Sequence, residues 1–156
     1  MALKVGDKAP EFTLFDTEKK QRSLKEFLGK KTLLAFFPGA FTGVCTKEAC
    51  AIRDSLSALN GKNAQVVGIS VDSPFANRGF AERNNLGFPL LSDYTHAVST
   101  QYCGLTTDFS GLPGLTVAKR SVFLLDPTGT VKYAWISDNP GVEPNYDEVN
   151  KALSSF

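Results

Sequence analysis

The sequence predicts an α/β domain in which a central mixed β-sheet is flanked by helices, and three observations lead to this. The 156 residues are 42% hydrophobic and 21% charged, which fits a single domain, 1–156, with one sizeable core. Two largely apolar runs, at 31–37 and 65–71, are each followed by a helical pattern. Strand–helix–strand units require a parallel pair of strands with helical cover. A hairpin pattern at 121–136 then adds antiparallel strands, which makes the sheet mixed.

The N-terminal extension comes first. Turn-forming residues at 16–18 separate short apolar stretches within 5–21, which indicates a β-hairpin or two short strands. Ser23 suits the N-cap of a helix and Gly29 suits its end, so we expect a short helix between them. The run 31–37, which a Pro-Gly pair closes, predicts a fully buried strand.

Helices and strands alternate after this point. The spacing of apolar residues predicts a helix over 42–60, and the run 65–71 predicts a second buried strand. Pro74 suits the first turn of a helix that runs to about Asn84. A further short helix is expected over 94–102.

The C-terminal part completes the pattern. Strands at 121–125 and 130–136 flank a turn, and the final helix is expected over 145–156, where Asn145 and Glu148 have the spacing of a capping box. A thioredoxin-like fold has this order of elements. The sequence therefore predicts a thioredoxin-like fold with an N-terminal extension and an insertion before the hairpin.

Charge and hydropathy exclude several classes of partner. The formal net charge is +1, and no block of like charge stands out, so nucleic acid and anionic membranes are not expected partners. The first residues lack the apolar segment and the cleavage site of a signal peptide. No apolar run has the length needed to cross a bilayer. We therefore expect a cytoplasmic protein.

The three cysteines, at 45, 50 and 103, do not form a disulfide scaffold in such a chain. Together with His96, the only histidine, they could in principle bind zinc, but no Cys-x₂-Cys pair is present. A cysteine hydrolase would also need His96 as its base, and nothing in the sequence orients it. The chain has no nucleotide-binding glycine motif. We expect neither a metal nor an organic cofactor.

The segment 37–45 carries the clearest chemical signal. A buried strand ends at Pro38, a glycine-containing turn follows, and Thr42 is a good N-cap for the next helix. Cys45 then takes the position at which a capping box would hold an anionic glutamate. The unpaired N–H groups and the positive end of the helix dipole favour a thiolate there. Cys45 also lies seven residues before Ile52 on the core-facing stripe, so we expect a shielded nucleophile.

At this point the chain resembles the peroxiredoxins. Pro38, Thr42 and Cys45 match the family signature Pro-x-x-x-Thr-x-x-Cys, and Arg120 stands where the family has an essential arginine, directly before a strand. The segments GDKAPEFTL at 6–14 and FPLLSD at 88–93 also look like family segments. A noncatalytic interaction protein on the same fold is the alternative, since a fold alone does not give a function. The complete constellation of four residues argues against it.

The resemblance implies a role for each of these residues. Cys45 attacks the distal peroxide oxygen and becomes a sulfenic acid. Thr42 hydrogen-bonds the thiolate and the peroxide, and Pro38 shields the sulfur from water. Arg120 stabilises the thiolate and polarises the peroxide, while the backbone N–H groups of Val44 and Cys45 bind its oxygens.

Two further expectations concern the surroundings of the sulfur. By the same resemblance, Glu48 orients the arginine. Apolar side chains at Phe37, Phe41 and Val44 would tolerate an organic hydroperoxide, and the sequence does not distinguish among hydrogen peroxide, alkyl hydroperoxides and peroxynitrite.

For recycling of the oxidised cysteine we expect Cys50 first, an external thiol second and Cys103 third. The spacing of Cys50 resembles the bacterioferritin-comigratory branch, in which this position forms an intramolecular disulfide. Residues five apart on an intact helix have Cα atoms about 8.7 Å apart, whereas a disulfide needs less than about 7 Å, so the helix would have to unwind. Other stretches look like alkyl hydroperoxide reductase E, which works with one cysteine and an external thiol, and Cys103 is a third option.

The resemblance also implies the protein's partners. The reductant is thioredoxin, glutaredoxin or a small thiol. Many family members form homodimers, although the sequence itself shows no interface.

Overall fold

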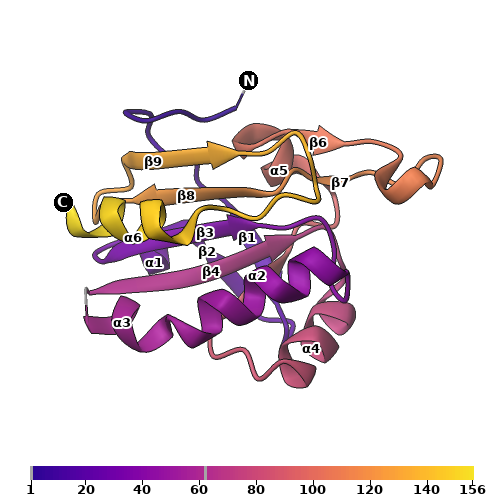
Figure 1. Cartoon of the computed structure of the whole chain (residues 1–156), viewed down its shortest axis with the longest axis horizontal. Helices are drawn as coiled ribbons and strands as arrows, with labels where there is room; N and C mark the ends of the chain where they lie inside the picture. Colours follow the sequence, from indigo (N-terminus) through magenta and orange to yellow (C-terminus); the bar gives the residue numbers. More distant parts are fainter. Residues whose placement is uncertain (1, 62) are drawn as a thin grey trace.

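A seven-stranded β-sheet runs through the centre of the protein, with helices on both of its faces (Figure 1). The computed structural model describes residues 2–61 and 63–156. The strands of this sheet are β1 (Thr13–Asp16), β2 (Gln21–Ser23), β3 (Lys31–Phe36), β4 (Ala64–Ser70), β5 (Leu90–Ser92), β8 (Ser121–Leu125) and β9 (Val131–Ile136). A separate ribbon pairs β6 (Leu105–Thr106) with β7 (Val117–Ala118). The helices are α1 (Leu24–Phe27), α2 (Gly43–Asp54), α3 (Leu56–Gly61), α4 (Pro74–Arg83), α5 (Ala97–Tyr102), the 3₁₀ helix η1 (Phe109–Gly111) and α6 (Tyr146–Ser154).

The sheet is mixed, as predicted, and has the strand order β2-β1-β5-β4-β3-β8-β9. Strand β3 pairs parallel with β4, and β4 pairs parallel with β5. Antiparallel pairing of β3 with β8 and of β8 with β9 places the predicted hairpin at one edge. The N-terminal hairpin, β1 with β2, occupies the other edge. The fold class expected from the sequence is confirmed.

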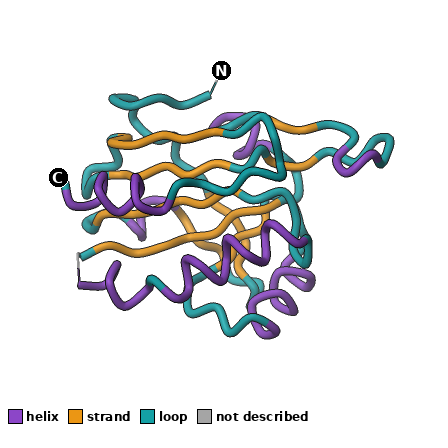
Figure 2. Tube along the Cα trace, viewed as in Figure 1, coloured by secondary structure: helices purple, strands orange, loops and turns teal. Residues whose placement is uncertain are grey.

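The two faces of the sheet have separate hydrophobic cores, because successive side chains of a strand point to opposite faces. On β3, Leu34 and Phe36 join the core beneath α1 and α5, whereas Leu33 and Ala35 join the core beneath α2, α3, α4 and α6. Figure 2 shows these helices on either side of the central strands. Strands β3, β4 and β8 are buried on both faces, which explains why their sequences are apolar runs rather than alternating patterns.

The helix predicted over 42–60 is divided in the structure. Helix α2 ends at Asp54, and Ser55 is its C-cap. The hydroxyl of Ser55 donates to the carbonyl oxygen of Ala51 at 3.0 Å, a local bond that competes with continuation of the helix. Helix α3 follows and ends at Gly61, where the sequence predicts the end.

Three further elements differ from the prediction. The segment after Pro89 is a short strand, β5, and the β6–β7 ribbon has strands of two residues each. The helix expected from residue 94 starts at Ala97. Its start is set by the buried carboxylate of Asp93, which accepts hydrogen bonds from the backbone N–H groups of Val98 and Ser99. Within the described ranges, no helix has the length and apolarity to cross a bilayer.

Candidate active site

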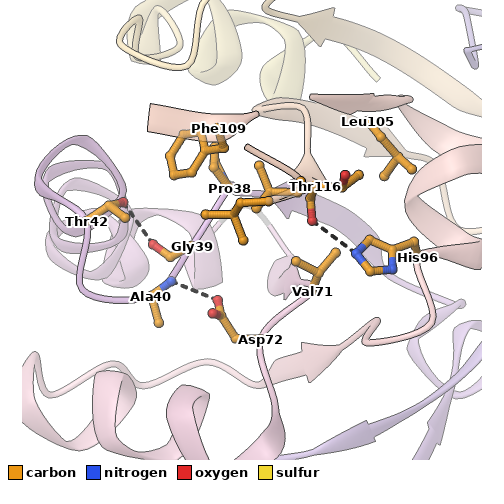
Figure 3. A pocket seen from close by; sticks show the side chains of 13 residues that line it. Pro38, Gly39, Ala40, Thr42, Val71, Asp72, His96, Leu105, Phe109 and Thr116 are labelled. Atoms are coloured by element: carbon orange, nitrogen blue, oxygen red, sulfur yellow. Dashed lines mark hydrogen bonds between the residues drawn. The ribbon is translucent and has the colours of Figure 1, made fainter. Parts of the chain in front are cut away.

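The turn between β3 and α2 places the predicted nucleophile. Pro38 is buried two residues after the end of β3, and Thr42 is the N-cap of α2, with φ −77° and ψ 152°. The backbone N–H of Ala40 donates to Oδ2 of Asp72 at 2.8 Å, which ties the turn to the segment after β4 (Figure 3). Cys45 lies in the first turn of α2 and is only 1% exposed, as the prediction of a shielded position requires.

The hydroxyl of Thr42 donates to the carbonyl oxygen of Gly39 at 2.9 Å (Figure 3). It does not cap the helix, so the N-cap side chain accepts no hydrogen bond from the backbone N–H groups of the first turn. These groups include those of Val44 and Cys45, which are expected to bind peroxide. Because this hydroxyl donates to Gly39, Thr42 does not form the hydrogen bond to Sγ of Cys45 that the resemblance implies.

Arg120 meets Cys45 at the centre of the site. Its Nη2 atom donates to Sγ of Cys45 at 3.1 Å, and its Nη1 atom donates to Oε1 of Glu48 at 2.7 Å. The remaining donors, Nε and Nη2, bind the carbonyl oxygen of Pro140 at 3.1 and 2.9 Å. Because Arg120 is 1% exposed and makes these four hydrogen bonds, it is a buried, hydrogen-bonded cation and not a solvated surface charge.

Arg120 and Glu48 both have shifted pKa values. Burial opposes the charged form of Arg120, but Cys45 and Glu48 outweigh burial and raise the pKa of the guanidinium. Burial raises the pKa of Glu48 to about 7, even though Arg120 beside it acts in the opposite direction. The structure thus contains the pairing of Glu48 with Arg120 that the resemblance implies.

An open pocket of about 370 Å³ leads to the arginine and to the first turn of α2. Its walls are Thr42, Gly43, Val44, Phe109, Ser110, Arg120, Pro140 and Gly141. A larger pocket of about 840 Å³ adjoins it and shares Thr42 and Phe109 with it. In that pocket Nε2 of His96 lies 3.0 Å from the carbonyl oxygen of Thr116 (Figure 3).

Some residues of this entrance are absent from the sequence prediction. Phe109 lies in η1, in a glycine-containing loop whose sequence has no feature that distinguishes it from other loops. Pro140 acts through its backbone carbonyl group, which leaves no side-chain signal. Phe41 is placed differently from expectation: it is 54% exposed, packs against Phe80 of α4 with ring centroids 5.5 Å apart, and lines neither of the two pockets.

The other two cysteines lie apart from the arginine. Cys50 is half-buried on α2, with Sγ 3.7 Å from Oδ1 of Asn84 at the end of α4. Cys103 belongs to the core on the opposite face of the sheet from Cys45. Burial raises the pKa of the Cys103 thiol to about 11. The part of the chain that the structure describes contains no cluster of three metal-ligating side chains.

Comparison with known proteins gives the family. The sequence profile described as the AhpC/TSA family matches residues 5–134. The chain belongs to the AhpC/TSA family. It is 39% identical over 142 residues to the putative peroxiredoxin bcp of Coxiella burnetii, a match that covers 86% of this chain and 89% of the relative. It is 38% identical over 151 residues to the chloroplastic peroxiredoxin Q of Gentiana triflora, which covers 96% of this chain and 66% of that protein.

Solved structures agree with this assignment. Peroxidoxin BcpB from Mycobacterium tuberculosis superimposes with a TM-score of 0.81 at 32% identity, over 97% of this chain and 95% of the other. A cysteine-to-serine mutant of PrxQ from Xylella fastidiosa has a TM-score of 0.86 at 22% identity, over 99% of this chain and 98% of the other, which shows the shared fold. The resemblance to peroxiredoxins is confirmed, and the protein is a thiol peroxidase, an oxidoreductase.

Proposed function

We propose that Cys45 is the cysteine that this peroxidase oxidises, and that it reduces both hydrogen peroxide and organic hydroperoxides. The observation that carries the proposal is the 3.1 Å hydrogen bond from Arg120 to Sγ of Cys45 in the first turn of α2. A permanent cation and a helix N-terminus both favour the thiolate, which is the nucleophile.

The chemistry follows from this geometry. The thiolate of Cys45 attacks the distal oxygen of the hydroperoxide, the O–O bond breaks, and the sulfur becomes a sulfenic acid. The N–H groups of the first turn and the guanidinium of Arg120 stabilise the charge that develops on the oxygens. The apolar walls of the adjoining pocket, among them Val71, Leu105 and Leu115, support the proposal that organic hydroperoxides are accepted.

Stopped-flow oxidation by hydrogen peroxide tests this function. Trp135 packs against the same core as Cys45, so its fluorescence reports changes there. The parent should react far faster than free cysteine, and Cys45→Ser should not react. Equal, slow oxidation of both proteins would contradict the proposal, and Cys103→Ser serves as the control thiol.

For the second half of the cycle we propose an intramolecular disulfide between Cys45 and Cys50. Both lie on α2, so the helix must unwind before the sulfur atoms can meet. The position of Cys103 on the other face of the sheet makes it the poorer candidate. The alternative is a one-cysteine cycle with an external thiol.

Thiol counting distinguishes the two routes. One equivalent of peroxide should remove two thiols from the parent and one from Cys50→Ser. Loss of two thiols in the variant would exclude Cys50 as the resolving residue, and loss of one in both proteins would favour the external thiol.

We further propose a cytoplasmic protein reduced by thioredoxin, glutaredoxin or a small thiol, and a homodimer as its assembly. Steady-state assays with each reductant and sedimentation of the purified protein test these points.

A further inference from the structure

Three ionisable groups share the buried site. Cys45 and Arg120 are each 1% exposed, and Glu48 is 2% exposed. Arg120 binds both of the others, with 3.1 Å to Sγ of Cys45 and 2.7 Å to Oε1 of Glu48. One cation therefore faces two acids. With a thiolate at Cys45, an ionised Glu48 would give the trio a net negative charge away from water, which is unfavourable.

The two carboxyl oxygens of Glu48 have different surroundings. Oε1 accepts the hydrogen bond from Arg120, whereas Oε2 is buried and has no hydrogen-bond partner among the described residues. Glu48 and Cys45 line a narrow cavity whose other walls carry no polar side chain: Ala35, Phe37, Ala49, Ile52, Gly68, Phe88 and Leu90. An uncharged hydroxyl costs far less in such a place than a charged oxygen. A proton on Oε2 also leaves the bond from Arg120 to Oε1 intact.

The groups that face Glu48 from other elements permit both protonation states near neutral pH. Burial raises the pKa of Glu48 to about 7; Arg120 opposes this rise, and Glu143, which precedes α6, adds to it. Tyr146 of α6 donates its hydroxyl hydrogen to Oε1 of Glu143 at 2.8 Å. Burial, that hydrogen bond and the charge of Glu48 raise the pKa of Tyr146, so it remains an uncharged neighbour.

We propose that Glu48 holds a proton while Cys45 is a thiolate and releases it when the sulfur is oxidised, so that the buried trio stays neutral throughout. This inference rests on the proposed function of Cys45. In the step itself, the thiolate sulfur donates an electron pair to the distal oxygen of ROOH, the S–O bond forms and the O–O bond breaks. The sulfur is oxidised to the sulfenic acid, and the peroxide is reduced to RO⁻, which needs one proton.

The charges balance on both sides of the step. Before it, the trio consists of a thiolate, a guanidinium and a neutral carboxyl group. After it, the trio consists of a neutral sulfenic acid, a guanidinium and a carboxylate. Glu48 loses one proton and the leaving oxygen gains one, so no proton is taken from the buffer. Glu48 thus does more than orient Arg120.

Infrared difference spectra test this role, with Cys50→Ser as the parent so that the sulfenic acid persists. One equivalent of hydrogen peroxide at pH 7 should remove the band of a protonated carboxyl group. Glu48→Gln keeps the size of the side chain and an oxygen that accepts from Arg120, but it should lack this band. In weakly buffered solution, the Gln variant should take up about one more proton per oxidised Cys45 than the parent.

Glu143→Gln is the matched control, because it removes a neighbouring carboxyl group outside the trio, and it should keep the band. The proposed role of Glu48 is overturned when the parent lacks the band, or when the band survives oxidation of Cys45. In either case the proposed function of Cys45 still stands. Thiol counting in the same sample shows whether Cys45 reacted. A thiol that does not react with peroxide would overturn the proposed function, and this inference with it.

Discussion

The Nη1 atom of Arg120 lies 2.7 Å from Oε1 of Glu48, and neither residue is more than 2% exposed. The same guanidinium reaches Cys45 and the carbonyl oxygen of Pro140. One planar group with its donors in a fixed fork therefore fixes the position of a carboxyl group, a sulfur atom and a loop at once.

Replacement of Arg120 by lysine should keep the charge but lose this geometry. An ammonium group is a point charge without the planar fork, so it cannot reproduce the four bonds that the guanidinium makes to these three partners. We expect the rate constant for oxidation of Cys45 by hydrogen peroxide to fall about 100-fold, the effect typical of losing one donor to a developing charge. Stopped-flow fluorescence measures it. Lys119→Ala is the control: Lys119 forms an ion pair with the exposed Asp138, such pairs contribute little, and its rate should stay near that of the parent.

Glu48 should make stability depend on pH in a defined direction. Its pKa is raised from 4.5 to about 7 on folding, so the folded state binds the proton more tightly than the unfolded state. The resulting stability is fully present below pH 4.5 and is lost as pH rises through about 7. The difference corresponds to roughly 3 kcal/mol. Urea unfolding should be measured at about pH 5 and about pH 8. Between these two pH values the free energy of unfolding should fall more for the parent than for Glu48→Gln. Equal losses in the two proteins would show that Glu48 does not titrate in this range.

Asp72 should support the turn that carries the signature residues. Its Oδ2 atom accepts hydrogen bonds from the backbone N–H of Ala40 and from the hydroxyl of Ser70, both at 2.8 Å. Asp72→Ala leaves the N–H of Ala40 without this acceptor, while the hydroxyl of Ser70 keeps Oδ1 of Asn77 at 3.2 Å. We expect a cost of about 1–3 kcal/mol and slower oxidation of Cys45 as well. Asp72→Asn keeps one oxygen acceptor and should lose less stability and less of the rate of Cys45 oxidation. Chemical unfolding and stopped-flow rates on the same samples check this, and an alanine variant as stable and as fast as the parent would contradict it.

Cys103 should behave as a structural thiol. It is 2% exposed, and burial raises its pKa to about 11, so almost none of it is thiolate at neutral pH. Alkylation of the folded protein by iodoacetamide at neutral pH should spare it. Cys103→Ala should retain the full rate of oxidation by peroxide. Rapid alkylation at this position, found by mass mapping, would show that the core opens more readily than the structure indicates.

The sequence predicts local patterns well and distant partners poorly. The apolar runs of β3, β4 and β8 and the turn before Cys45 are visible because their signals lie within a few residues of one another. Glu48 and Arg120 are 72 residues apart, and spacing alone does not reveal that they meet; only the resemblance to a family suggests it. The contribution of Pro140 is harder still to predict, because it comes from a backbone carbonyl group, which every residue has. Strand β5 has only three residues, too few for a periodic pattern.

Because Cys45 and Cys50 share the single helix α2, an intact helix and a bond between these two sulfurs exclude each other. In the disulfide cycle proposed above, the rigidity of α2 and the turnover of the enzyme should then oppose each other. A substitution that lengthens the lifetime of α2, such as Gly43→Ala, would protect the fold against heat. The same substitution would slow disulfide formation between the sulfenic acid of Cys45 and Cys50. The sulfenic acid would then be exposed for longer to a second peroxide molecule. Selection for a more heat-resistant variant should therefore be accompanied by faster inactivation in excess oxidant.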